Sequence, residues 1–177
     1  MLSSVWRRRT IWFGLGLLTG ALLTGMILGV FGELVSPLPS ELRSRLAVVV
    51  GILLAFVEFI GWSEHLPQRR QLVQATIISR PPSAGALQFG FEMGTGYRTY
   101  SPSSSPLIAG IGVILIGGMV PGLLAGAGFA GGRTLVPLLR PVGARPTRWD
   151  DQMLRWSWLV SAICTTGCVA TILAVIL

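Results

Sequence analysis

Two carboxylates and one arginine stand where their charges could bind a solute: Glu58, Glu92 and Arg98. Glu58 lies inside the apolar run 46–62, and an ionisable group in such a run is costly enough to indicate a function. It could bind a proton or a substrate there. Because Trp62 follows four residues later, a helix-end role, in which Glu58 reaches headgroups or water, is an equal alternative.

Glu92 and Arg98 lie in the glycine-rich string FGFEMGTGYRTY, residues 89–100. This string matches neither the GxxxxGK[ST] pattern nor the full GxGxxG pattern, so nucleotide binding is not predicted. Transporters place substrate groups at interrupted membrane segments, which makes Glu92 and Arg98 a substrate-binding hypothesis. The alternative is a turn at Gly94 and Gly96, with Arg98 facing the headgroups.

The two cysteines, Cys164 and Cys168, are four residues apart in the string CTTGC. This spacing places both thiols on one helix face, where they could exchange a disulfide or bind a metal. A pair within one continuous helix is poorly directed for a disulfide, and cysteine also packs as a small apolar residue. His65 is the only histidine, so we predict no metal site, and no pattern predicts a cofactor or a catalytic residue.

The composition predicts that the helices carrying these residues lie in a lipid bilayer. Of the 177 residues 51% are apolar and 12% are charged, about half the charged fraction of a soluble domain. The 14 basic residues are all arginines and lie between apolar runs, where they would meet anionic headgroups and not nucleic acid. Four runs approach or exceed the length of a bilayer crossing: residues 11–31, 46–62, 107–130 and 156–177.

We therefore expect an all-α, polytopic transmembrane helical bundle of about four spans, forming a single domain over residues 1–177 in the bacterial cell membrane. With a cytoplasmic N-terminus, four crossings would leave seven arginines on each side, against the excess that short cytoplasmic loops carry. One extra broken or re-entrant segment would restore that excess and place the C-terminus outside.

Two segments could supply the extra turn. Residues 84–96 are too short for an ordinary span and alternate apolar and polar residues, a period of two that favours an extended or broken segment. The run 107–130 contains Pro121 and Gly122 near its middle. These residues could fold it into a re-entrant hairpin, or Pro121 could kink one continuous helix.

Glycines four residues apart indicate where helices touch, because small residues let helix backbones approach closely in lipid. These predicted helix-packing positions are Gly16, Gly20, Gly25, Gly29, Gly118, Gly122 and Gly126. They would pack within the chain, or join it to a second copy or to a membrane protein partner.

The strings GALQFGFEMGTGYRTY (residues 85–100) and GFAGGRTLVPLLR (residues 128–140) resemble those of uncharacterised small multi-pass membrane proteins of actinobacteria. In size and span number the chain also resembles, more loosely, the redox-associated membrane proteins of the MauE and DoxX kind. Neither resemblance supplies catalytic residues. We expect an accessory or structural subunit of a membrane complex. The alternatives are a small transporter or channel-like module built on a broken segment, and a thiol-redox membrane protein using both cysteines.

Overall fold

The computed structural model describes residues 2–60, 81–96, 104–139 and 146–176, and these residues form six α-helices and no strand. The helices are α1 (Leu2–Val35), α2 (Ser40–Phe59), α4 (Pro82–Gly94), α5 (Ser105–Ile116), α6 (Met119–Leu139) and α7 (Pro146–Ile176). The all-helical part of the predicted fold class is therefore confirmed over the described residues.

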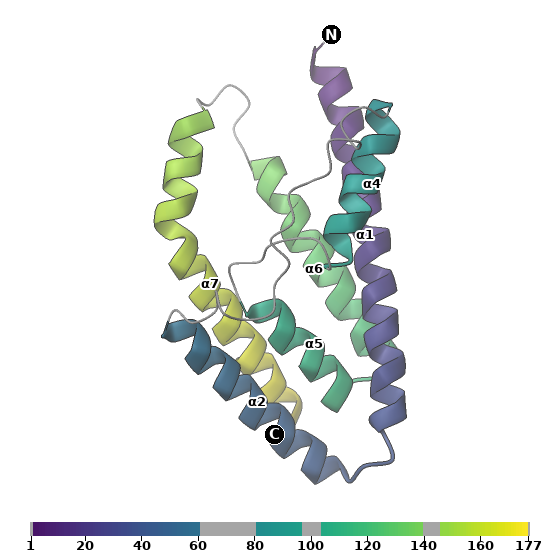
Figure 1. The fold of residues 1–177 in the computed structure, drawn as a ribbon, viewed down its shortest axis with the longest axis vertical. Coiled ribbons are helices and arrows are strands. Elements are labelled where there is room, and N and C mark those ends of the chain that lie inside the picture. Colours follow the sequence, from purple (N-terminus) through teal and green to yellow (C-terminus); the bar gives the residue numbers. More distant parts are fainter. Residues whose placement is uncertain (1, 61–80, 97–103, 140–145, 177) are drawn as a thin grey trace.

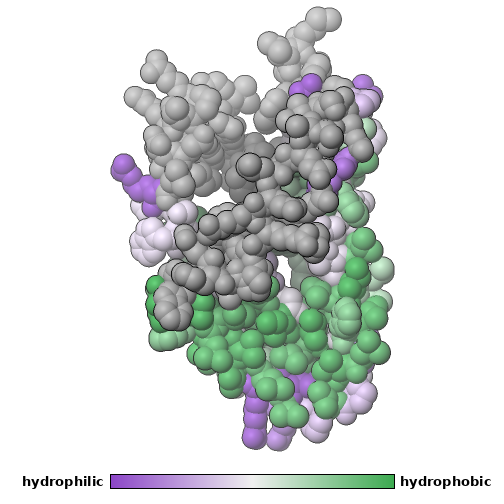
Figure 2. Space-filling view, viewed as in Figure 1, coloured by the Kyte–Doolittle hydropathy of each residue, from purple (hydrophilic) through white to green (hydrophobic). Residues whose placement is uncertain are grey.

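Two of these helices are long and apolar enough to cross a bilayer, over Arg8–Val35 and Arg155–Ala174. Only 33% of the apolar window in the first, and 11% of that in the second, is buried inside the structure, whereas the core helix of a soluble protein is mostly buried. Large apolar side chains such as Phe56, Leu124 and Trp158 are exposed, and hydrophobic residues cover the lower half of the face in Figure 2. Soluble monomers rarely expose apolar surface on this scale, which indicates membrane association.

Helix α1 is the element on which α4, α5 and α6 all pack (Figure 1). Along α1, Gly16 lies against Leu87 and Gly20 against Phe91, so α4 runs parallel to α1. Helix α6 runs antiparallel to it. Helix α2 turns back after α1 and packs on α5 and α7, and α7 ends near the opposite end of the molecule from the N-terminus (Figure 1).

Residues 84–94 of the segment 84–96 belong to helix α4, so the extended conformation suggested by its period of two is wrong. A helix bonds its own backbone groups, and in α4 it also places Gly90 and Gly94 on the face toward α1. A Cβ at Gly90 would overlap the carbonyl oxygen of Phe13, and both glycines are buried. Helix α4 ends where Gly96 takes a φ of 68°, a left-handed conformation that favours glycine.

The predicted run 107–130 divides into α5 and α6 at Gly117 and Gly118, four residues before the centre expected from Pro121. The proline ring clashes with the carbonyl four residues earlier, which is that of Gly117, so a continuous helix breaks there. Beyond the break α6 returns along α1, with Met119 beside Gly29. A helical hairpin, and not a kinked continuous helix, is the arrangement in the structure (Figure 1).

All seven predicted packing glycines lie at close helix contacts inside the chain. Gly16 and Gly20 of α1 lie against α4, and Gly25 and Gly29 of α1 lie against the start of α6. On the other side of this contact, Gly122 and Gly126 of α6 lie against the backbone of α1. Gly118, which comes just before α6, lies against the Glu33 side chain. A Cβ at Gly29 would lie 2.8 Å from the Cα of Met119, closer than real Cβ contacts. By contrast, a Cβ at Gly128, Gly131 or Gly132 would meet nothing within 4 Å.

Candidate functional site

Glu58 joins three helices through its carboxylate. Its Oε2 accepts a hydrogen bond of 2.7 Å from the backbone N–H of Ser104, at the start of α5. Its Oε1 accepts a short hydrogen bond from the hydroxyl of Ser161 on α7. A carboxylate at a helix N-terminus is stabilised by the unbonded amides and by the helix dipole. The partners of Glu58 therefore come from two segments that are distant from it in the sequence.

Helix α5 is held by α2 at both of its ends. While Glu58 binds its N-terminus, the guanidinium of Arg43 donates a hydrogen bond of 3.5 Å to the carbonyl of Leu115 in its last turn. A negative group at the N-terminus and a positive group at the C-terminus both match the helix dipole. Because α5 has only 12 residues, it reaches about 18 Å, which is short of a full crossing.

Helix α5 packs beside the apolar run of α1. Helix α4 ends at Thr95, whose carbonyl accepts a hydrogen bond of 3.3 Å from Thr24. Two turns into α5, Gly110 faces Leu28. Thr24 and Leu28 both belong to the apolar run 11–31. The start of α5, to which Glu58 binds, is therefore close in the fold to the apolar run 11–31, and the Glu58 side chain itself is half-buried.

Further hydroxyl groups surround the contact of Glu58 with α5 and α7. Ser104 is 0% exposed, and its hydroxyl donates to the carbonyl of Leu54 at 3.3 Å. On α7, Ser161, Thr165 and Cys168 share one helix face, and the thiol of Cys168 lies 3.9 Å from the carbonyl oxygen of Ser105. We call Glu58, Ser104, Ser161 and Thr165 the Glu58 cluster.

No ion pair neutralises Glu58 among the residues that the structure describes. The salt bridge found in the described part of the chain joins Arg45 and Glu41 at 3.3 Å, on the exposed start of α2. The groups that contact Glu58 from α5 and α7 are an amide and a hydroxyl, and the nearest other titratable groups of α7 are the thiols of Cys164 and Cys168. An ionisable group inside an apolar run is a candidate functional residue.

Glu92 lies on α4, away from the Glu58 cluster, because α4 packs on α1 whereas Glu58 contacts α5 and α7. Its Oε1 accepts a hydrogen bond of 2.9 Å from Gln88. Arg98 lies outside the described residues, as do Trp62 and His65. The predicted grouping of Glu58 with Glu92 is therefore not formed.

Both cysteines are free thiols within the continuous helix α7, Cys164 exposed and Cys168 half-buried. A disulfide between them would require the helix to unwind, since side chains one turn apart do not present the needed geometry. Among the described residues no three His, Cys, Asp or Glu side chains gather as metal ligands.

Two sequence features correspond to residues of the Glu58 cluster, but neither feature by itself predicts that these residues meet Glu58. Ser104 and Ser105 precede Pro106, which is a helix-start signal, and Ser161 and Thr165 stand one turn apart in an apolar run. A second carboxylate that no sequence pattern singled out also binds a helix N-terminus. Glu33 accepts a hydrogen bond of 3.4 Å from the N–H of Met119 at the start of α6. Glu33 is exposed, so it offers a natural comparison for Glu58.

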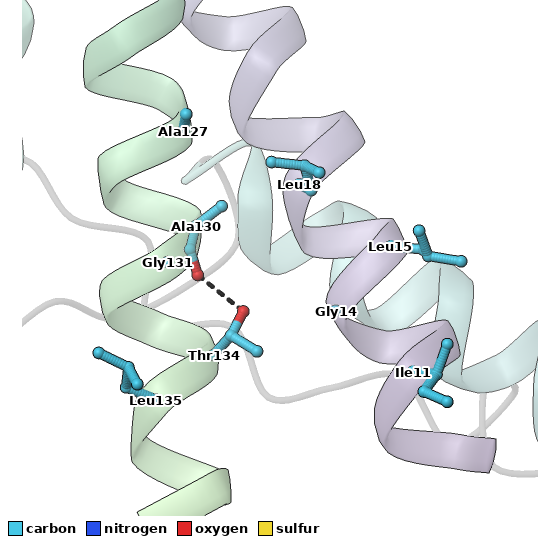
Figure 3. Close-up of a pocket in the computed structure, with 9 residues that line it drawn as sticks. All are labelled: Ile11, Gly14, Leu15, Leu18, Ala127, Ala130, Gly131, Thr134 and Leu135. Atoms are coloured by element: carbon cyan, nitrogen blue, oxygen red, sulfur yellow. Dashed lines mark hydrogen bonds between the residues drawn. The ribbon is translucent and has the colours of Figure 1, made fainter. Parts of the chain in front are cut away.

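An apolar groove of about 570 Å³ runs between α1 and α6 on the surface (Figure 3). It is lined by Ile11, Gly14, Leu15, Leu18, Ala127, Ala130, Gly131, Thr134 and Leu135. The hydroxyl group of Thr134, in the lining of the groove, donates a hydrogen bond of 2.7 Å to the carbonyl of Ala130. The groove therefore offers apolar contact and no group for chemistry.

No protein-family model matches the chain, and neither curated proteins nor solved structures show significant similarity to it.

Proposed function

We propose that the chain is a multi-pass membrane protein that acts as a small transport module, in which Glu58 takes up and releases a proton. One observation carries this proposal: the Glu58 carboxylate accepts hydrogen bonds from the N-terminal amide of the 12-residue helix α5 and from Ser161 of α7, and among the described residues it forms no ion pair. Interrupted helices that present their termini to a solute at mid-depth are a common design of transporter sites.

The expected accessory-subunit role remains the second candidate. It is favoured by the exposed small residues of α6, because Gly128, Gly131 and Gly132 meet nothing within 4 Å and could admit a partner helix or a second copy. The predicted packing glycines no longer support it, since they are used within the chain. Activity of the purified chain alone separates the two roles, because an accessory subunit requires its partner.

Proton uptake by liposomes containing the purified protein tests the transport proposal. The vesicles hold a pH-sensitive dye, equal potassium chloride on both sides and valinomycin, and the external medium is then acidified. We expect the protein to accelerate acidification of the lumen severalfold over empty vesicles, and Glu58→Gln to abolish the gain, because an amide cannot carry the proton. Glu33→Gln and Glu92→Gln should retain it. Uptake by Glu58→Gln at the wild-type rate would refute the proposal.

The proposed topology has the N-terminus in the cytoplasm and the C-terminus outside. In a background lacking Cys164 and Cys168, single cysteines are introduced as Arg8→Cys, as Ser36→Cys and after the last residue. An impermeant thiol reagent applied to intact cells should label Ser36→Cys and the C-terminal cysteine but not Arg8→Cys, since α1 and α7 end on the same side. Protection of the C-terminal cysteine, with Ser36→Cys labelled, would instead indicate an even number of crossings.

A further inference from the structure

Thr165 carries a buried hydroxyl that has no hydrogen-bond partner. The residue is 0% exposed. Threonines of other helices, including Thr24 and Thr134, donate to the carbonyl one turn back in their own helix, and so does Thr171 on α7 itself. Buried polar groups are nearly always bonded, so an unpaired hydroxyl indicates a ligand or a second state of the site.

Thr165 lies on the face of α7 whose other residues contact Glu58 and the start of α5. It lies on α7 between Ser161, which binds Glu58, and Cys168, which contacts the carbonyl of Ser105. All three share one helix face. The unpaired donor therefore belongs to the place where an amide and a second hydroxyl already hold a carboxylate.

The Glu58 carboxylate is itself an anion held by donors: the N–H of Ser104 and the hydroxyl of Ser161. Once Glu58 is protonated, its attraction to the helix dipole falls, and these donors lose a charged acceptor in apolar surroundings. A free anion would replace that acceptor and could also bond the hydroxyl of Thr165. The cluster would then carry one negative charge in both states.

We propose that, when Glu58 is protonated, the Glu58 cluster binds one small monovalent anion on the N-terminus of α5, so that a proton and an anion are bound together. This inference rests on the proposed function and names its substrate class. Because the anion takes the place of a carboxylate between packed helices, it must be about as small as one, such as chloride or nitrate. A large anion such as gluconate does not fit.

Replacing chloride by gluconate in the vesicle assay tests the inference. Proton uptake that depends on Glu58 should fall to the level of empty vesicles in potassium gluconate and should return in potassium chloride or potassium nitrate. If that uptake continues in gluconate at the chloride rate, the proton role stands and the anion inference is wrong. If no proton uptake depends on Glu58 in potassium chloride, potassium nitrate or potassium gluconate, the proposed function fails as well.

The part of Thr165 is tested by Thr165→Val, which removes the hydroxyl and keeps the shape. A hydrogen bond to a charged ligand is lost, so the chloride concentration for half-maximal uptake should rise about tenfold. Thr165→Ser keeps the hydroxyl and should restore the wild-type value, while Thr171→Val on the exposed face of the same helix should leave it unchanged. An unchanged chloride dependence in a folded Thr165→Val protein would show that Thr165 does not bind the anion. An equal rise of the half-maximal chloride concentration in Thr165→Val and Thr165→Ser would show the same.

Discussion

Gly122→Ala is expected to destabilise the protein by about 3 kcal/mol, near the upper end of the cost of overpacking. A Cβ at Gly122 would overlap the carbonyl oxygen of Gly25, and the obstacle is backbone, which cannot rotate away as a side chain can. Helices α1 and α6 would have to separate along the contact that Gly25, Gly122 and Gly126 form. Close backbone contact is a main source of helix association in lipid, so little would compensate the loss.

The matched control is Gly128→Ala, the same substitution six residues along the same helix. A Cβ there meets nothing within 4 Å, and alanine favours a helix over glycine by up to about 1 kcal/mol. Thermal unfolding of both variants in one detergent, followed by circular dichroism, gives the comparison. We expect the Gly128→Ala protein to be as stable as the wild type or more so. Equal stability of the two variants would show that the α1–α6 contact is wrong.

The long helices could be predicted from the sequence because each carries its own signal. The apolar run 11–31 lies within α1, and the run 156–177 lies within α7 as far as Ile176. Helix α1 extends beyond its run at both ends and α7 begins ten residues before its run, since helical backbone continues past the apolar part. Spaced glycines were also informative, because a spacing of four places them on one helix face whatever the fold. What the sequence left open was whether these faces meet within the chain or between chains.

The errors arose where contacts between segments decide the local structure. The alternation in residues 84–96 resembles a strand, yet packing of Gly90 and Gly94 on α1 favours a helix. Glu58 was identified by its cost in an apolar run, but its partners Ser104 and Ser161 stand 46 and 103 residues away. No spacing rule links such residues. Glu92 is a candidate because it lies with Arg98 in a glycine-rich segment, and that pattern does not determine which helices pack together.

The central question about Glu58 is whether it exchanges a proton or only caps α5. A structural cap contributes about 0.5–2 kcal/mol, and Glu58→Gln would preserve much of that because the amide oxygen can still accept the N–H of Ser104. Stability alone therefore does not separate the two roles. Detection of the protonated carboxyl group does, since only a residue that exchanges protons contributes a carbonyl band that depends on pH.

Infrared difference spectroscopy of the protein in liposomes, between mildly alkaline and acidic pH, makes this measurement. We predict that acidification produces a carboxyl band from an apolar site, at higher frequency than that of hydrated carboxyls. This band should be absent from Glu58→Gln and present in Glu33→Gln and Glu92→Gln, whose carboxylates lie on an exposed helix terminus and on α4. The same band in Glu58→Gln as in the wild type would contradict the proposal that Glu58 carries the proton.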